Sequence, residues 1–421
     1  MENWMDSKRE ETPHQSKGSG RINGRLSLIF LIMLMDIIGL TFLWPVAPFI
    51  VEQYSDKALM VSMITILYAA GQFIAAPLMG KLGDRYGRRP VLLVSLLGQG
   101  IAYVIFGIGG ALWVLFLGRL IGGITGGNLS TASAYIADIS KPEERTKNFT
   151  LIGIAWSLGL ILGPAVGGLF TQINLQAPAY AAGLLSFLNV FLSFFFLPES
   201  LPAEHRETSP MKMSDLNPIV AIFDMARKPG LGWLLLVTCL FNFAFNGISS
   251  TSSVFLIDKF GAQAWQVSLL LTLGGVSLAV MQFLFVQRLV KRFGERRIAI
   301  TSLVGQAVNN LAIFFAPAFW WIFPISMVNS ATSGFTFPTL TTLNTNRVQP
   351  REVGLLMGVT TGLGSLMNIF GPLWAGVVYD RVGLGAPYWM GAIVFLLAAG
   401  MLWVVRENQP QKTIQVTAFK A

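Results

Sequence analysis

Twelve long apolar runs, separated by short polar stretches, dominate the chain. Each run holds about 20 residues, enough for a helix to cross the ~30 Å hydrocarbon core of a bilayer. This pattern predicts an all-α membrane protein with twelve transmembrane helices. The expected spans are residues 26–50, 58–79, 91–110, 112–136, 149–171, 178–197, 231–257, 265–287, 298–316, 320–343, 353–378 and 386–405.

Composition supports this class. Hydrophobic residues make up 53% of the chain and charged residues only 12%, whereas soluble domains carry about 25% charged residues. The first 25 residues are polar and have no apolar core, so we expect a retained tail and not a cleaved signal peptide. The single cysteine, Cys239, excludes an intramolecular disulfide and a cysteine metal cluster. Neither a metal nor another cofactor is expected.

The net charge of +9 is distributed unevenly. With the N-terminus assigned to the cytoplasm, 26 of the 30 lysines and arginines fall in the tails and inner loops, and only Lys57, Lys259 and Arg381 fall in outer loops. The positive-inside rule then predicts that both termini are cytoplasmic. The basicity is explained by membrane topology, so no nucleic-acid partner is expected.

Internal symmetry indicates a tandem duplication. The sequence GKLGDRYGRR at 80–89 has a weaker copy, QRLVKRFGERR, at 287–297, and a shift of 207 to 208 residues superposes spans one to six on spans seven to twelve. We therefore expect a cytoplasmic tail (1–25), a six-helix bundle (26–197), a proline-rich cytoplasmic linker (198–230), a second six-helix bundle (231–405) and a C-terminal tail (406–421). Parallel six-helix repeats are typical of transporters that rock one half against the other.

Five stretches of the chain resemble the drug:proton antiporter branch of the major facilitator superfamily, in particular the tetracycline exporters. They are MDIIGLTFLWPVAPF, YAAGQFIAAPLMGKLGDRYGRRPVLL, ALWVLFLGRLIGGITGG, GLILGPAVGGLF and LPES. The resemblance implies two pseudo-symmetric six-helix bundles and proton-coupled efflux of lipophilic drugs or organic metabolites by alternating access. We expect a monomer in a bacterial cytoplasmic membrane, with small-molecule substrates, protons and the lipid bilayer as its partners.

Asp36 and Arg119 are the only charged residues deep inside an apolar run. A charge at the bilayer centre costs about 3 kcal/mol on the insertion scale, which marks both residues as functional candidates. At 1.5 Å per residue both come near the midplane, so they can form a pair or share a cavity. One interpretation is a static ion pair. The other is a proton switch, because burial favours neutral Asp36 while a nearby arginine favours the carboxylate. Both positions also match the antiporter pattern.

The loop at 80–89 combines turn-forming glycines with an acid among arginines. Asp84 can bind a facing helix N-terminus or an arginine of the other half, which would make the loop a latch. The alternative, a basic loop that only sets topology, does not explain Asp84. In the second copy Lys291 replaces this acid, so the latch is expected on one side only. The proposed gating residues here are Gly80, Asp84, Arg85, Gly87, Arg88, Arg89 and, at the end of span four, Asp138.

Span five carries Gly163, Pro164, Gly167 and Gly168 in a small-residue pattern that begins at Gly159. Small residues let helices approach closely, and a proline bends a helix. We expect packing and bending at the interface between the halves, and we count these residues with the gate.

Departures from the tetracycline exporters limit the expected substrate. Of the three intramembrane acids of those pumps only Asp36 remains, so we do not expect binding of a cationic metal–tetracycline chelate. One arginine and many amides suit an amphipathic, weakly charged or anionic organic compound. The candidate substrate-binding residues are Gln72, Asn128, Trp156, Asn242, Asn246, Gln282, Gln306 and Asn309, with further apolar walls from Trp44, Phe241, Phe245 and Phe335.

Two alternatives to a proton-driven exporter stay open at this stage. A facilitator or symporter of an organic solute is favoured if Asp36 is permanently paired. A membrane enzyme or receptor lacks support, because no span holds a histidine, a reactive cysteine or an acid cluster that could serve as a catalytic site.

Overall fold

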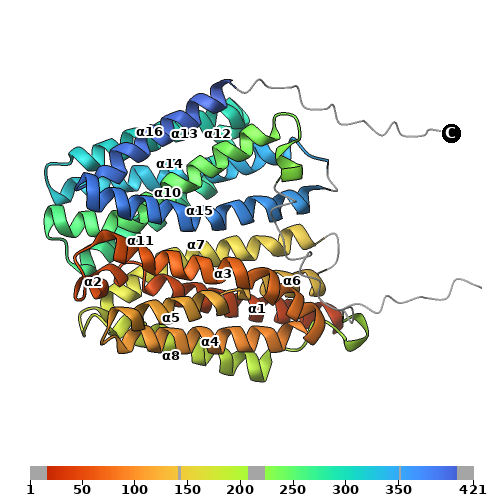
Figure 1. The fold of residues 1–421 in the computed structure, drawn as a ribbon. Helices are drawn as coiled ribbons and strands as arrows, with labels where there is room; N and C mark the ends of the chain where they lie inside the picture. The colour runs from red at the N-terminus through yellow and green to blue at the C-terminus, as the bar shows by residue number, and fades with distance from the viewer. Residues whose placement is uncertain (1–16, 141–143, 207–222, 350–351, 405–421) are drawn as a thin grey trace, which may run out of the picture.

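The fold is known from a computed structural model, which describes residues 17–140, 144–206, 223–349 and 352–404. Two layers of long, roughly parallel helices lie against each other (Figure 1). The first half contains α1 (Lys17–Phe42), α2 (Ala47–Glu52), α3 (Ala58–Tyr86), α4 (Arg88–Ile108), α5 (Leu112–Thr125), α6 (Asn128–Ile139), α7 (Arg145–Phe170) and α8 (Ala177–Phe196). A short 3-10 turn, η1 (Ala203–His205), follows. The second half contains α10 (Leu231–Phe260), α11 (Ala264–Leu284), α12 (Val286–Phe293), α13 (Glu295–Phe315), α14 (Phe319–Thr345), α15 (Val353–Val382) and α16 (Ala386–Val404).

The prediction of a twelve-span, all-helical membrane protein is confirmed. Among the described residues, eleven helical segments are long and apolar enough to cross a membrane. The twelfth is α14, whose 27 residues include many hydroxyl and amide side chains that lower its mean hydropathy. Asn329, Thr332, Thr336 and Asn344 all lie within it.

Three spans that the sequence predicts as continuous are interrupted. Span one breaks between α1 and α2 around Pro45, because a proline restricts the residue before it to extended conformations. Span four breaks between α5 and α6 at the pair Gly126–Gly127, where two residues of low helix propensity meet. Span eight breaks at Phe285, between α11 and α12; nothing in the local sequence explains this break.

The two ends of the helical bundle differ in charge. We call the end where α3 meets α4, near Arg85, Arg88 and Arg89, the basic end, and the end where α2 meets α3 the opposite end. In Figure 1 the basic end lies at the right and α2 at the left.

The two halves meet along two helix pairs, α3 with α15 and α7 with α11. At the opposite end, the Asp380 carboxylate of α15 accepts hydrogen bonds from the backbone N–H groups of Ala58 and Leu59, at 2.9 and 3.1 Å. A Cβ added to Gly376 would lie 2.8 Å from the Cα of Leu59, so the two helices are in close contact there. The halves are therefore held together at the opposite end.

A cavity between the two halves

A cavity of about 780 Å³ lies between the halves. Trp44 and Pro48 border it toward the opposite end, and Thr238, Asn344 and Met357, all within two turns of the helix ends at the basic end, border it on that side. The halves contact each other at the opposite end, and the lining reaches toward the basic end through Thr238, Asn344 and Met357. A volume of this size suits a drug-sized molecule.

Both intramembrane charges line this cavity. Asp36 is half-buried on the α1 wall, and its side chain is hydrogen-bonded to Asn128. Arg119 is 6% exposed and places its guanidinium carbon 4.8 Å from the centroid of the Phe106 ring. Within the described part of the chain, no carboxylate lies within 4.0 Å of Arg119, and its buried Nε has no hydrogen-bond partner. The two charges share a cavity without forming an ion pair.

The break in span four positions several of the polar groups of the first half. Gln72 Nε2 donates to the Gly126 carbonyl at 3.1 Å, which satisfies an acceptor near the end of α5. Asn128 begins α6 directly after the break and reaches Asp36. The Tyr68 hydroxyl lies so close to Gly126 that an added Cβ would be 2.7 Å away. Tyr68, which the sequence analysis did not single out, thus lies in the cavity wall near both charges.

The second half contributes amide and hydroxyl groups and no ionisable side chain to the described lining. Asn242 and Asn246, two of the residues predicted to bind substrate, lie on α10 in the cavity wall, with Phe241 and Phe245 beside them. Sequence reasoning missed several lining residues of α10 and α15, although their spacing of three to four residues marks one face of a helix. They are Ser249, Ser250, Ser253, Thr361, Ser365 and Asn368.

Seven of the ten residues assigned to proton coupling or substrate binding line the cavity: Asp36, Gln72, Arg119, Asn128, Trp156, Asn242 and Asn246. The other three do not. Gln306 is buried in the second half and donates to Thr336 Oγ1 at 2.9 Å. Asn309 is 9% exposed on the same helix, and Gln282 is exposed on α11. Of the predicted apolar walls, Trp44 lines the cavity and Phe335 does not.

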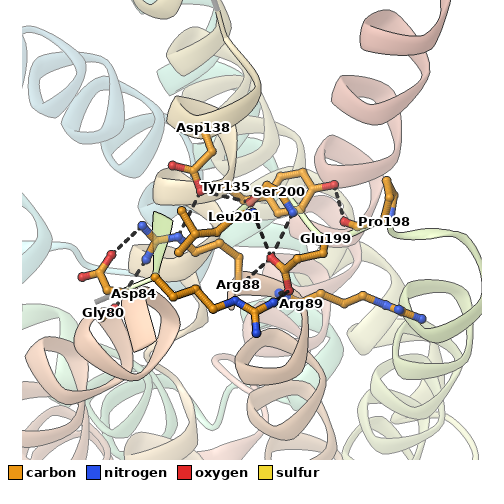
Figure 2. A network of polar contacts seen from close by, with 11 residues as sticks. Gly80, Asp84, Arg88, Arg89, Tyr135, Asp138, Pro198, Glu199, Ser200 and Leu201 are labelled. Carbon is orange, nitrogen blue, oxygen red and sulfur yellow. Dashed lines mark hydrogen bonds and ion pairs between the residues drawn. The ribbon is translucent and has the colours of Figure 1, made fainter. Parts of the chain in front are cut away.

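At the basic end a polar network surrounds Arg88 (Figure 2). The Arg88 guanidinium pairs with Asp84 at 2.6 Å and with Asp138 at 3.1 Å, and it donates to the Gly80 carbonyl at 3.4 Å. All these partners belong to the first half. The structure therefore brings together the predicted gating residues around Arg88, with Asp84 turned to its own half in this state. Arg85 is exposed and lies over the Tyr86 ring.

Glu199 completes this network and was not among the predicted gating residues. Its carboxylate accepts hydrogen bonds from the backbone N–H groups of Arg88 at 2.9 Å and Arg89 at 3.2 Å, so it caps the amino terminus of α4. Gly87, with φ of +103°, makes this approach possible, because an added Cβ would lie 2.4 Å from Glu199 Oε2. Arg89 donates to the carbonyl of Phe194 at the end of α8. Glu199 lies in the LPES stretch at 197–200, which the sequence analysis used only for the resemblance to the antiporter family and not as a capping signal.

The small-residue stripe of α7 packs mainly within its own half, which differs from the expected interface between halves. A Cβ added to Gly163 would overlap Thr41 Oγ1 of α1, and a Cβ added to Gly167 would lie 2.7 Å from the carbonyl oxygen of Phe42, also in α1. Thr41 Oγ1 donates to the Gly159 carbonyl at 2.9 Å. Only Gly168 of this stripe meets the second half, at Ser268 of α11. Pro164 lies inside a continuous α7.

Comparison with known proteins decides the family. The profile of the Major Facilitator Superfamily matches residues 29–285 and 253–419. The chain belongs to the Major Facilitator Superfamily. Within it, the chain is 34% identical to the class C tetracycline resistance protein of Escherichia coli, over 89% of this chain and 95% of that protein. It is 26% identical to multidrug resistance protein 2 of Bacillus subtilis (strain 168), over 90% and 96%.

A solved structure of the same superfamily is also similar. The human organic anion transporter MFSD10 (TETRAN) matches with a TM-score of 0.68 and 26% identity, over 92% of this chain and 100% of that chain. Together with the cavity between two six-helix halves, these relatives show that this superfamily member is an integral multi-pass membrane transporter of the drug-efflux type and not an enzyme.

Proposed function

We propose that the protein exports lipophilic organic compounds in exchange for protons, with Asp36 as the proton carrier. The observation that supports this most directly is the position of Asp36. Its carboxyl group faces the cavity beside Asn128 and has no cation within 4.0 Å among the described residues. A carboxyl group without a fixed counter-ion in a water-accessible cavity can gain and lose a proton as the environment changes.

Alternating access supplies the route. The cavity extends toward the basic end while Asp380 and the α3–α15 contact hold the opposite end together. By the positive-inside rule, the basic end faces the cytoplasm, so this state would receive substrate from the cell interior. The gating role of the Arg88 network, a monomeric state and a bacterial cytoplasmic membrane are part of this proposal.

The lining indicates what kind of compound fits. The first half offers apolar side chains such as Ile37, Leu96 and Trp156 with two charges, and the second half offers uncharged hydrogen-bonding groups. An amphipathic molecule with one apolar face and one edge of hydroxyl or carbonyl groups matches both walls. The lining residues of the second half contain no acid that would favour a polycation.

Asp36→Asn tests the proposal in inverted membrane vesicles with an acid interior. Tetracycline, a quinolone and a lipophilic dye are added, and proton release is followed with a pH-sensitive fluorophore. We expect release with at least one compound for the natural protein and none for Asp36→Asn, while binding of that compound stays measurable. Asp56→Asn, an exposed acid outside the cavity, is the matched control. Full uphill export by Asp36→Asn would reject the role of this residue.

A facilitator or symporter remains the second candidate function. The same assay separates the two, because a facilitator moves solute without moving protons, and a symporter moves protons in the direction of the solute. Solute-driven proton movement that survives Asp36→Asn would place the coupling at another residue.

A further inference from the structure

The basic loop at 80–89 and its copy at 287–297 differ in the interactions that their arginines and lysines make. Gly87 and Gly294 occupy equivalent turns, with φ of +103° and +81°. Two residues later, Arg89 donates to the carbonyl of Phe194 at the end of α8, and Arg296 donates to that of Leu402 at the end of α16. The arginine that anchors each loop to the last helix of its half is thus present in both.

Among the residues that the structure describes, only the first copy has acidic partners for its arginines. There Arg88 lies between Asp84 and Asp138, and Glu199 caps the following helix. In the second copy Lys291 stands in place of the first acid, and a Cβ on Gly294 would meet no atom within 4 Å. Apart from Arg296, the cations Arg288, Lys291 and Arg292 of the second copy have no acidic partner among the described residues.

These cations share one face of α12. Arg288, Lys291 and Arg292 recur at intervals of three and four residues, which places them on one side of a helix. All three are exposed. The structure gives none of them an ion pair or a hydrogen bond with a described residue; Arg292 lies over the Phe293 ring at 5.3 Å. On the other face, Val286 is buried and anchors α12 to the protein.

The cationic face lies directly after an exposed apolar stretch at the end of α11. Phe283, Leu284 and Phe285 immediately precede α12 and are 63%, 52% and 40% exposed, and Phe293 at its end is 44% exposed. In a membrane these apolar side chains contact lipid tails. Arg288, Lys291 and Arg292 then lie at the depth of the phosphate groups of the lipid.

We propose that this face of α12 binds the headgroups of anionic phospholipids. Guanidinium groups bind phosphate oxygens in a bidentate manner, and a basic cluster next to a transmembrane helix concentrates anionic lipid. The positive-inside rule accounts for the presence of cations here during insertion. Binding of lipid headgroups by the folded protein is a different property from this role in insertion, and it can be measured on purified protein.

The test uses native mass spectrometry of the purified full-length protein titrated with palmitoyl-oleoyl phosphatidylglycerol or phosphatidylcholine. We expect tighter binding of phosphatidylglycerol and at least a tenfold loss of that preference in Arg288→Gln/Lys291→Gln/Arg292→Gln. The control, Lys57→Gln/Arg227→Gln/Arg381→Gln, removes three exposed cations elsewhere and should keep the preference.

Further arms separate the alternatives. Arg288→Lys/Arg292→Lys preserves the charge and should retain phosphatidylglycerol binding, which keeps the test valid if the glutamine variant is unstable. Inorganic phosphate at the same concentration should not displace the lipid, because the flanking phenylalanines also hold its acyl chains. Equal binding of the two lipids, equal losses in both triple variants, or displacement by phosphate would overturn the proposal.

Discussion

Asp380 of the second half caps the amino terminus of α3 in the first half, accepting a hydrogen bond from the Ala58 backbone N–H at 2.9 Å. The first N–H groups of a helix have no partner within it, and α3 has no capping side chain of its own. The Asp380 carboxylate of the second half therefore accepts hydrogen bonds from backbone N–H groups at the start of α3 in the first half. This contact exists only while the opposite end is closed.

Removing this cap should favour opening of the opposite end. Loss of a capping side chain costs about 1 kcal/mol, so Asp380→Ala should raise the open fraction roughly fivefold. Asparagine also caps helices well, and Asp380→Asn should stay close to the natural protein. Distances between spin labels at residues 53 and 384, measured by pulsed electron resonance after replacing Cys239 with serine, report the equilibrium. Identical distributions for alanine and asparagine would show that the cap does not hold this state.

The Gly87–Glu199 contact predicts unequal effects of the same substitution in the two loop copies. Gly87→Ala combines a positive φ with a Cβ at 2.4 Å from Glu199 Oε2, so it should displace the cap of α4. Gly294→Ala meets only the positive φ, because its surroundings are open. We expect about 2 kcal/mol or more of destabilisation for the first and about 1 kcal/mol for the second. Thermal unfolding in detergent measures both, and equal midpoints would contradict the contact.

Two amides of the second half should behave in opposite ways. Asn246 lines the cavity, so Asn246→Ala should weaken substrate binding about three- to tenfold with little change in stability. Gln306 lies outside the cavity and bonds Thr336, so Gln306→Ala should lower the free energy of unfolding by about 1–3 kcal/mol without changing affinity. Ligand titration, monitored by tryptophan fluorescence, measures the affinity, and thermal unfolding measures the stability. A shared loss of affinity would indicate that both amides face substrate.

The separation of Asp36 from Arg119 makes a further quantitative prediction. Breaking a buried ion pair costs about 3–5 kcal/mol, whereas residues that are not in contact contribute independently within about 0.5 kcal/mol. In a cycle of Asp36→Asn, Arg119→Gln and the double variant, we expect the stability changes to add. A coupling of several kcal/mol would mean that the two side chains pair in the dominant solution state.

Sequence patterns predicted the elements that depend on hydrophobicity, and they placed seven of the ten candidate coupling and binding residues in the cavity wall but not the other three. The twelve spans follow from apolar run length, and the breaks at Pro45 and Gly126–Gly127 are visible once helix propensity is considered. Whether Gln306 faces the cavity or a neighbouring helix depends on how α13 is rotated against α14, which one helix alone does not encode. Asp380 looks like an ordinary acid at the end of a span, because its partners are backbone groups more than 300 positions away in the chain.

The unequal chemistry of the two cavity walls has a consequence for how such a protein can change. Asp36 and Arg119 belong to one wall, and the facing wall of asparagine, serine and threonine carries no charge among its described residues. Under the proposed function, mutations that enlarge, shrink or change the polarity of the neutral wall are expected to alter which compounds bind without changing either charged group. The second half can therefore acquire mutations that change substrate preference while the first half keeps its two ionisable groups.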